Sequence, residues 1–433
     1  MSTPASCVRG VCCSTAPSVT GGDRARKPAD RLMAILIDPP AWPAHGRLWA
    51  HLVSDVSYDE LHAFAAAHGV PRRGYERDHY DVPADAYEAL VAAGASPVSS
   101  RVLLERLTRS GLRLRKATSM AHRASGNALL RPSRLHPGDL VAVTAPAGPV
   151  QEDRLEAGLE RLRTWGLRVR VQPHTLDTHP LGYLAGIDVD RAADFADVWM
   201  DDDVAAVIAG RGGYGAQRIL GLLDWRRLAE ARPKILVGFS DVTALHQAVA
   251  TRLGLATLHA HVTTSLGAAS ADSVERMRSM LFEPAAIDLF EGSDVRAVTH
   301  GSATGVLIGG NLTILASETG TPFARPARGG ILLLEDVAEE SYRLDRLLTQ
   351  LLRSGWFEGA RGIVLGDFSD CGDPVAVEAT LLDRLRSLAV PMVAGFDFGH
   401  TPTSRSVPLG VRATLAVPTD RRPSLTLVEP PFL

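Results

Sequence analysis

A serine lies where an apolar run meets a helical pattern. The segment Lys234–Val249 reads KILVGFSDVTALHQAV, in which apolar residues first run together and then recur at helical spacing as Val242, Leu245 and Val249. Ser240 therefore lies at a predicted strand-to-helix turn, where enzymes that form an acyl intermediate can present a nucleophile. The alternative is that the Ser240 hydroxyl only caps the helix.

A glycine-rich loop precedes this serine. Gly210–Leu220 reads GRGGYGAQRIL, and its glycines permit positive φ angles, which let backbone N–H groups approach a ligand. One interpretation is a phosphate cradle, although the spacing matches neither G-x-G-x-x-G nor the P-loop. A second is an oxyanion hole, in which N–H groups of this loop and of Asp241 hold the charge that develops when Ser240 attacks a carbonyl. A third is a tight turn alone.

Acid–base groups occur later in the chain. Glu335 and Asp336 follow the apolar run GGILLL, and a carboxylate that emerges from a buried strand needs a partner. His400 lies in a loop rich in Gly, Pro and Ser. Isolated loop histidines are mostly surface residues, so His400 alone does not indicate catalysis.

The first part of the chain is rich in side chains that can bind a metal. No pair among them has the His-Glu-x-x-His or Cys-x-x-Cys spacing of metal sites. A metal site and a hydrogen-bonded structural cluster both remain open, and three arginines either contact an anion or are solvated. The metal-binding types are Asp38, His45, His51, Asp55, His62, Glu76, Asp78 and His79, and the arginines are Arg72, Arg73 and Arg77.

The elements that position these residues follow from hydrophobic patterning. Residues 134–297 alternate short apolar runs with amphipathic segments, which predicts parallel βαβ units. Residues 298–433 contain many short strand-like runs and one strong helical pattern, Tyr342–Leu352, which predicts a β-rich domain. Residues 33–116 predict a small α/β domain, 117–133 have the composition of a linker, and 1–32 form a polar leader that we expect to be flexible.

Composition and charge exclude several classes of protein. The chain has 433 residues, which indicates two or three domains. Its 46 Lys+Arg and 49 Asp+Glu give a formal net charge of -3, so we expect no nucleic-acid partner. No apolar run reaches the length of a membrane span, and the leader lacks the apolar core of a secretory signal. Cys7, Cys12, Cys13 and Cys371 make no disulfide framework, so we expect a cytoplasmic protein.

Six segments, taken in order, resemble the LD-carboxypeptidase family of serine peptidases, which includes the microcin-C immunity peptidases. The resemblance covers about residues 134–433, and the segments are RGGYGAQRIL, GFSDVTALH, IGGNLTIL, LLLEDVAEESYRLDRLLTQL, GIVLGDFSDC and FGHTPTSRSVPLG. It implies an α/β nucleophile domain resembling class I glutamine amidotransferases, followed by a β-rich domain. Residues 33–116 are similar to a small bacterial domain of uncharacterised function.

The resemblance also assigns residue roles. Ser240 becomes the nucleophile, Glu335 the acidic member of the triad and His400 the general base. Gly213 and Asp241 become the backbone donors of the oxyanion hole, and Tyr214 is placed near the substrate. No metal or cofactor is required by this chemistry.

The implied activity is hydrolysis of an L,D-peptide bond, releasing a terminal D-amino acid. The expected partner is a small peptide, D-alanine being released from murein tetrapeptide during cell-wall recycling. One alternative is cleavage of a peptidyl or aminoacyl nucleotide antibiotic. Another is a non-catalytic binding module that works through the first domain, although all three triad residue types are present. The sequence leaves the oligomeric state open, with a homodimer as one option.

Overall fold

The computed structural model describes residues 35–44, 46–76, 78–109 and 128–433. The chain divides into two compact units, Met1–Leu114 and Arg115–Leu433. The predicted leader 1–32, which carries Cys7, Cys12 and Cys13, lies outside the described residues, as does most of the predicted linker 117–133.

The first unit contains a six-stranded sheet. Its order is β4-β5-β3-β1-β6, and β2 pairs with β3. The burial pattern of β5 alternates, as expected when the two faces of a strand have different environments. The strands are β1 (Ile35–Ile37), β2 (Trp42–Ala44), β3 (Arg47–Ser54), β4 (Tyr75–Glu76), β5 (His79–Pro83) and β6 (Ser96–Pro97).

Helices cover both faces of this sheet. Helix α1 (Tyr58–Ala67) begins where the Ser57 side chain accepts a hydrogen bond from the Glu60 N–H. The buried apolar residues of α1 belong to one core cluster. This cluster also contains Leu90 of α2 (Tyr87–Ala92) and alternate residues of the strands. Helix α3 (Ser100–Arg109) packs against the opposite set of strand residues. The first unit is therefore a small α/β domain.

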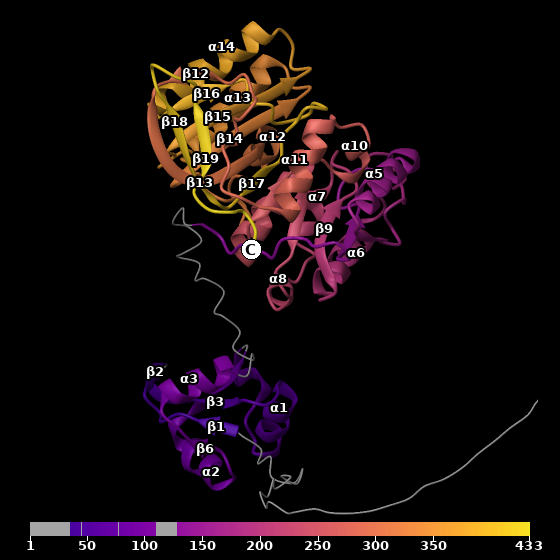
Figure 1. Ribbon diagram of the computed structural model, residues 1–433. Helices are drawn as coiled ribbons and strands as arrows, with labels where there is room; N and C mark the ends of the chain where they lie inside the picture. The colour runs from indigo at the N-terminus through magenta and orange to yellow at the C-terminus, as the bar shows by residue number, and fades with distance from the viewer. Residues whose placement is uncertain (1–34, 45, 77, 110–127) are drawn as a thin grey trace, which may run out of the picture. The chain divides into compact units, whose positions relative to one another are not determined.

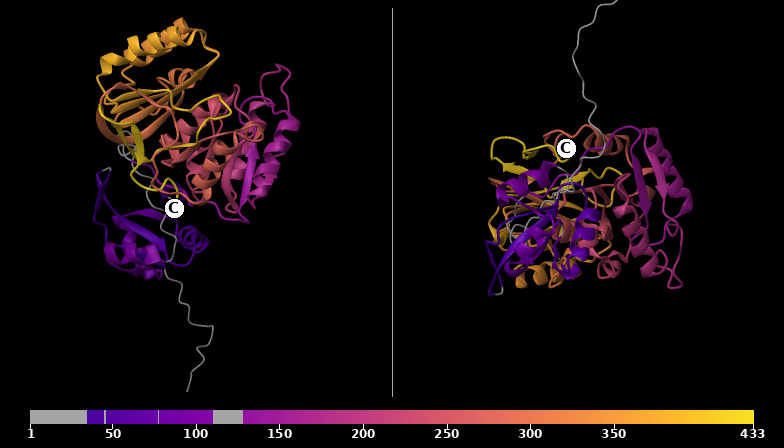
Figure 2. Two further views of the ribbon diagram at one scale, coloured as in Figure 1. Left: turned by 45° about the horizontal axis from the view of Figure 1, so that its top comes forward. Right: turned by 90° about the horizontal axis from the view of Figure 1, so that it is seen from below.

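The second unit contains two sheets, shown with their helices in Figures 1 and 2. The first has the order β17-β11-β10-β9-β7-β8. All its strands are parallel except β17, which is antiparallel to β11. The strands are β7 (Leu140–Thr144), β8 (Arg168–Val171), β9 (Val204–Ala209), β10 (Ile235–Gly238), β11 (Thr257–His259) and β17 (Val407–Leu409).

Helices enclose this first sheet, which explains why its central strands are apolar on both faces. One core cluster joins α5 and α11 to one face, and another joins α6 and α9 to the other. The longer helices are α5 (Glu152–Thr164), α6 (Asp188–Met200) and α11 (Ala271–Phe282). The shorter ones are α7 (Ala216–Leu220), α8 (Trp225–Leu228), η3 (Ser240–Val242), α9 (Thr243–Ala248), η4 (Val249–Leu253) and α10 (Thr263–Leu266).

The second sheet has the order β12-β16-β15-β14-β13-β18-β19. Strands β13 to β16 are parallel, and β12, β18 and β19 pair antiparallel to their neighbours. The strands are β12 (Arg296–Thr299), β13 (Gly301–Asn311), β14 (Gly330–Val337), β15 (Gly362–Ser369), β16 (Met392–Ala394), β18 (Arg412–Val417) and β19 (Ser424–Leu427).

The helices of this part correct one expectation. Helix α13 (Ser341–Arg353) contains the predicted Tyr342–Leu352, but α14 (Pro374–Leu385) is a second long helix, and α12 (Leu312–Ser317) is a short one. Asp373 caps α14 by accepting a hydrogen bond from the Val375 N–H. The apolar pattern of α14 is weak because Val375 lies on its exposed side, with 76% of its surface accessible.

Strand β14 separates two environments. Ile331 and Leu333 belong to the core cluster that also contains residues of the first sheet. Leu332 and Leu334 belong to the cluster with α13 and α14. Successive side chains on a strand point to opposite faces, so the next two residues of β14 must also diverge.

The last part of the chain returns to the first sheet. Strand β17 pairs with β11, with Leu258 opposite Pro408. The predicted segments 134–297 and 298–433 do not coincide with the two sheets, because β17 belongs to the first sheet and β12 of the second sheet begins at Arg296. The pairing of β17 with β11 joins residues about 150 positions apart, so local hydrophobic patterns cannot predict it. Within the described ranges, no helix combines the length and apolarity needed to cross a bilayer.

The second unit begins before residue 134. The Leu129 N–H donates to the Gly410 oxygen at 2.7 Å, and the Leu130 N–H donates to the Gly254 oxygen at 2.9 Å. Leu130 also forms a bridge with Leu255. These contacts attach the residues from 129 onward to the second unit.

A chain that starts at Ala128 should therefore fold without the first unit. A chain that starts at Leu135 should melt at a lower temperature, because it loses these backbone hydrogen bonds and the packing of Leu129. Scanning calorimetry of the two truncated chains measures the difference. Equal melting temperatures would show that residues 128–134 do not belong to the folded unit.

Candidate active site

Ser240 occupies a sharp turn at the carboxyl end of β10. Its φ of 61° lies in the left-handed region, which is uncommon and strained for a residue other than glycine. Within the described residues, neither η3 nor α9 has a side-chain cap hydrogen bond. The Ser240 Oγ instead lies 2.9 Å from the His400 Nε2. This geometry favours the nucleophile elbow over the capping serine.

His400 connects Ser240 to Glu335. The His400 Nδ1 lies 2.7 Å from the Glu335 Oε2, and the two side chains are 16% and 0% exposed. The loop approaches this carboxylate closely at Gly399, which has a φ of 145°. A Cβ atom on Gly399 would lie 3.1 Å from the Glu335 Oε2. Glycine at this position therefore permits the approach of His400.

Burial and charge act in opposite directions on this pair. Burial raises the pKa of Glu335, and the hydrogen bond from His400 offsets only part of that rise. Burial lowers the pKa of His400, but the hydrogen bond and charge of Glu335 outweigh it, so the His400 pKa is raised. Glu335 thus stabilises the protonated imidazole, as a base that accepts the serine proton requires.

Asp336 has a different environment, as the alternation along β14 requires. Its carboxylate accepts hydrogen bonds from the Asn311 Nδ2 at 2.9 Å and from the Val337 N–H at 2.9 Å. It also accepts from the Thr313 N–H at 2.9 Å and the Thr313 Oγ1 at 2.8 Å. Asp336 therefore holds the start of α12, while Glu335 faces His400.

The glycine-rich loop packs directly against the nucleophile. A Cβ atom on Gly212 would lie 2.8 Å from the Ser240 Cβ, so only glycine permits this approach. Gly213 has a φ of 103°, and the Gly212 oxygen accepts a hydrogen bond from the Gly148 N–H at 2.9 Å. Contact with Ser240 favours the oxyanion-hole interpretation of this loop over the phosphate cradle.

The Asp241 side chain forms a hydrogen bond with the same loop. Its Oδ2 accepts a hydrogen bond from the Ala216 N–H at 2.7 Å, and its side chain is buried. Burial raises the pKa of Asp241 to about 6, although this hydrogen bond opposes the rise. This hydrogen bond holds the backbone at Asp241, next to Ser240, close to the loop that carries Gly213.

Ser240 and His400 line a cleft of about 680 Å³. Arg154, Arg211 and Asp153 are the charged residues among its lining groups. The remaining lining residues are Ala157, Gly212, Gly213, Phe239, His261, Val262, Thr264, Ser265, Gly267, Ala268, Thr401 and Pro402.

Tyr214 and His261 differ in their relation to the cleft. Tyr214, expected near the substrate, is exposed, and its ring centroid lies 5.8 Å from that of Tyr183. It is not among the residues that line the cleft. His261 does line the cleft, and burial lowers its pKa to about 4, so it is neutral near pH 7. The sequence signal for His261 is its position just after the short, buried strand β11.

The metal-binding residue types of the first unit separate into several groups. His51 and His79 come together, with Asp38 and Asp78 as their hydrogen-bond partners. Sequence analysis missed Asp81, which joins them; its signal is the polar–apolar alternation HYDVP of β5.

The other candidates of this unit lie elsewhere. Asp55 forms an ion pair with Arg106, and His62 contacts the Tyr80 hydroxyl. The Arg72 guanidinium lies 3.3 Å from that hydroxyl rather than facing an anion. The side chains of His45, Glu76, Arg73 and Arg77 lie outside the described residues.

Three domain families match separate parts of the chain. Residues 141–260 match the LD-carboxypeptidase N-terminal domain, and residues 304–415 match the LD-carboxypeptidase C-terminal domain. Residues 35–110 match a family described as a protein of unknown function (DUF4031).

Curated relatives cover the second unit. A Streptomyces coelicolor protein, whose name places it among the carboxypeptidases, is 50% identical over 305 residues, covering 70% of this chain and 97% of that one. A "probable murein peptide carboxypeptidase" of Bacillus subtilis is 36% identical, covering 66% of this chain and 91% of that one. The murein tetrapeptide carboxypeptidase of Pseudomonas aeruginosa is 37% identical, with coverages of 64% and 92%.

Solved structures share the fold of the second unit. Muramoyltetrapeptide carboxypeptidase from Oxalobacter formigenes matches with a TM-score of 0.57 and 31% identity, covering 66% of this chain and 98% of that one. An MccF-like protein from Bacillus anthracis matches with a TM-score of 0.63 and 24% identity, with coverages of 69% and 99%. At that identity the second match shows the fold alone.

The two neighbouring carboxylates should differ in what they contribute to stability. Asp336→Asn should lower the free energy of unfolding by about 2 to 4 kcal/mol, because an amide nitrogen would face donors that now bond to a carboxylate. Glu335→Gln should change the free energy of unfolding by less than about 1 kcal/mol. Burial already disfavours the carboxylate charge, and an amide oxygen can still accept a hydrogen bond from His400. Urea unfolding of both variants measures this. The reverse order would contradict the assigned partners.

Proposed function

The chain belongs to the LD-carboxypeptidase family, and on this basis we propose that it is a serine peptidase. The hydrogen-bonded chain from Ser240 through His400 to Glu335, at the wall of the cleft, is the observation that carries the proposal. We further propose that it hydrolyses the bond between an L-centre and a terminal D-amino acid.

The mechanism follows from the three atoms that are aligned. His400 Nε2 accepts the Ser240 proton as Oγ attacks the carbonyl carbon, and Glu335 stabilises the imidazolium that forms. The backbone N–H groups of Gly213 and Asp241 stabilise the oxyanion. The imidazolium then protonates the leaving amine, and the D-amino acid departs from the acyl-enzyme. His400 next takes a proton from water, which attacks the Ser240 ester and releases the shortened peptide.

The charges of the cleft suit a peptide with a free terminal carboxylate. Arg154 and Arg211 both line the cleft and supply cations for such a group. The Arg211 guanidinium also donates to the Pro149 oxygen at 2.8 Å, which holds its side chain in place. Asp153 offers an anion for an amino group of the same substrate. A peptide with both charges fits this lining.

Murein tetrapeptide is the substrate that we propose, with D-alanine as the released residue. Two relatives above 30% identity have murein peptides in their names, and a solved relative is a muramoyltetrapeptide carboxypeptidase. The proposed role is cell-wall recycling in the cytoplasm. The microcin C7 self-immunity protein MccF is 22% identical to this chain, so the likeness supports a shared fold rather than a nucleotide substrate.

Replacing Ser240 tests the proposed nucleophile. Ser240→Ala should reduce release of D-alanine from murein tetrapeptide by several orders of magnitude without loss of the fold, because no acyl-enzyme can form. Ser270→Ala is the matched control, since Ser270 caps α11 through the Ser273 N–H. It should cost about 0.5 to 2 kcal/mol of stability and keep turnover. Product masses from tetrapeptide and from an aminoacyl nucleotide decide the substrate class, and turnover of the nucleotide alone would overturn our choice.

The pH profile tests the pairing of His400 with Glu335. In the wild type, kcat/KM should fall on the acid side with an apparent pKa above the ordinary histidine value of about 6.5, since Glu335 raises the His400 pKa. Glu335→Gln should move this limb to lower pH and reduce turnover by orders of magnitude. Asp336→Asn should move the limb less than Glu335→Gln does, because Asp336 acts on the His400 pKa through its charge alone and less than Glu335 does. An unshifted limb in Glu335→Gln would remove Glu335 from the mechanism.

A further inference from the structure

Three side chains of the first unit converge on one face of its sheet. His51 on β3 is directly opposite Asp81 on β5 in an antiparallel pair. His79 lies two residues before Asp81 and therefore points to the same face. The strand register alone thus brings two imidazoles and one carboxylate together.

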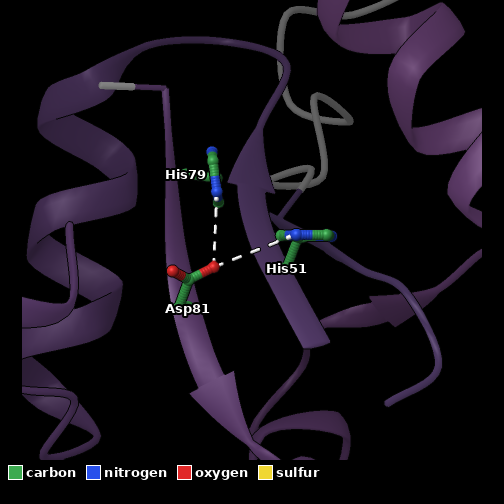
Figure 3. A group of neighbouring side chains, drawn as sticks. All are labelled: His51, His79 and Asp81. Carbon is green, nitrogen blue, oxygen red and sulfur yellow. Dashed lines mark ion pairs between the residues drawn. The ribbon is translucent and has the colours of Figure 1, made fainter. Parts of the chain in front are cut away.

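The ligand atoms of these residues face one another. The His79 Nε2 lies 3.4 Å from the Asp81 Oδ1, and the His51 Nε2 lies 3.9 Å from the same oxygen. All the ligand atoms of this trio lie within 4.8 Å of one another. Figure 3 shows His79 and Asp81 projecting from one strand and His51 from its neighbour, with both rings directed toward the carboxylate.

The other nitrogen of each ring bonds to a buried carboxylate. The His51 Nδ1 lies 3.1 Å from the Asp38 Oδ2, and the His79 Nδ1 lies 2.7 Å from the Asp78 Oδ1. Carboxylates accept hydrogen bonds, so each Nδ1 carries a proton, and the Nε2 of each ring is the nitrogen left to bind a cation beside Asp81. Two ring nitrogens and one carboxylate oxygen thus form a single group of donor atoms.

The carboxylate behind His51 is itself held firmly. Asp38 accepts hydrogen bonds from the His51 backbone N–H at 2.6 Å and from the Ser100 Oγ at 2.7 Å. Ser100 begins α3, so this helix fixes the position of Asp38. Metal-binding histidines commonly have such carboxylate partners, which set the tautomer and orient the ring.

We propose that His51, His79 and Asp81 bind a divalent transition-metal ion of the Zn²⁺ type. Ligand atoms about 2.0 to 2.2 Å from a tetrahedral zinc are separated from one another by roughly 3.3 to 3.6 Å. The His79–Asp81 separation already has this value, and the His51 ring needs only a small movement. Two imidazoles favour Zn²⁺, Fe²⁺, Co²⁺ or Ni²⁺ over Mg²⁺ and Ca²⁺.

The site has room for a ligand from solution. The His51, His79 and Asp81 side chains are 25%, 15% and 39% exposed. Three protein ligands with an open face match a catalytic or ligand-binding metal site, whereas structural zinc sites are closed by four protein ligands. Water or an anionic group would occupy the open position.

A second group of metal-binding types, His174, Asp177 and Asp190, is less suitable. It offers one imidazole, and its Nδ1 already bonds to the Asp177 Oδ2 at 2.9 Å. Asp177 is exposed, so this group resembles a solvated ion pair. It provides a useful comparison in the experiment.

Titration of the full chain with Zn²⁺ tests the proposal. The protein, without a polyhistidine tag and dialysed against a chelator, should bind one equivalent of Zn²⁺ in calorimetry. His79→Ala and Asp81→Ala should each weaken binding at least tenfold. His68→Ala removes an exposed histidine outside the trio, and this control should bind as the wild type does.

Co²⁺ spectra identify the ligands independently. The expected visible bands are those of nitrogen and oxygen ligation, without the near-ultraviolet band that thiolate ligands add, and they should disappear in His79→Ala. Circular dichroism checks that Asp81→Ala, a change at a partly exposed side chain, retains the fold. The proposal is overturned if the full chain binds no Zn²⁺, if thiolates supply the ligands, or if His174→Ala rather than His79→Ala abolishes binding.

Discussion

The buried contact between His400 and Glu335 constrains the arrangement of the second unit. A carboxylate with no exposed surface is costly, and among the described residues the Glu335 Oε1 has no hydrogen-bond partner. The 2.7 Å contact with His400 is therefore its main compensation. That contact requires the end of β14 in the second sheet to face the loop that follows β16. Ser240 joins the same chain of hydrogen bonds only because β10 of the first sheet ends beside them.

Local sequence predicted the parts of this site and not their assembly. The apolar run before Ser240 and the helical spacing after it predict the turn, because both depend on neighbouring residues. The choice of Glu335 over Asp336 came from family resemblance, and the structure gives a physical reason for it: side chains alternate along β14, so one faces His400 and the other faces α12. The pairing of β17 with β11 and the contact of His51 with Asp81 depend on register between distant strands, which local patterns do not contain.

Buried carboxylates orient histidine rings in both units, but toward different groups. In the first unit two paired strands bring the side chains together, and in the second unit the ends of strands from two sheets do so. Glu335 holds His400 so that its free nitrogen faces a hydroxyl, whereas Asp38 and Asp78 hold His51 and His79 so that their free nitrogens face a carboxylate. The first arrangement suits proton transfer and the second suits a cation. We thus propose that the chain combines a serine-peptidase site with a separate metal site.

Proton NMR of the imidazole N–H of His400 tests the central claim most directly. A strong hydrogen bond from Nδ1 to a buried carboxylate shifts this proton far downfield, and the signal does not depend on the choice of substrate. Our account predicts a far-downfield resonance that persists in Asp336→Asn and moves upfield in Glu335→Gln, where a neutral amide oxygen replaces the carboxylate. A resonance that keeps its position in Glu335→Gln, or one that is absent from the wild type, would contradict the proposed Ser240–His400–Glu335 chain.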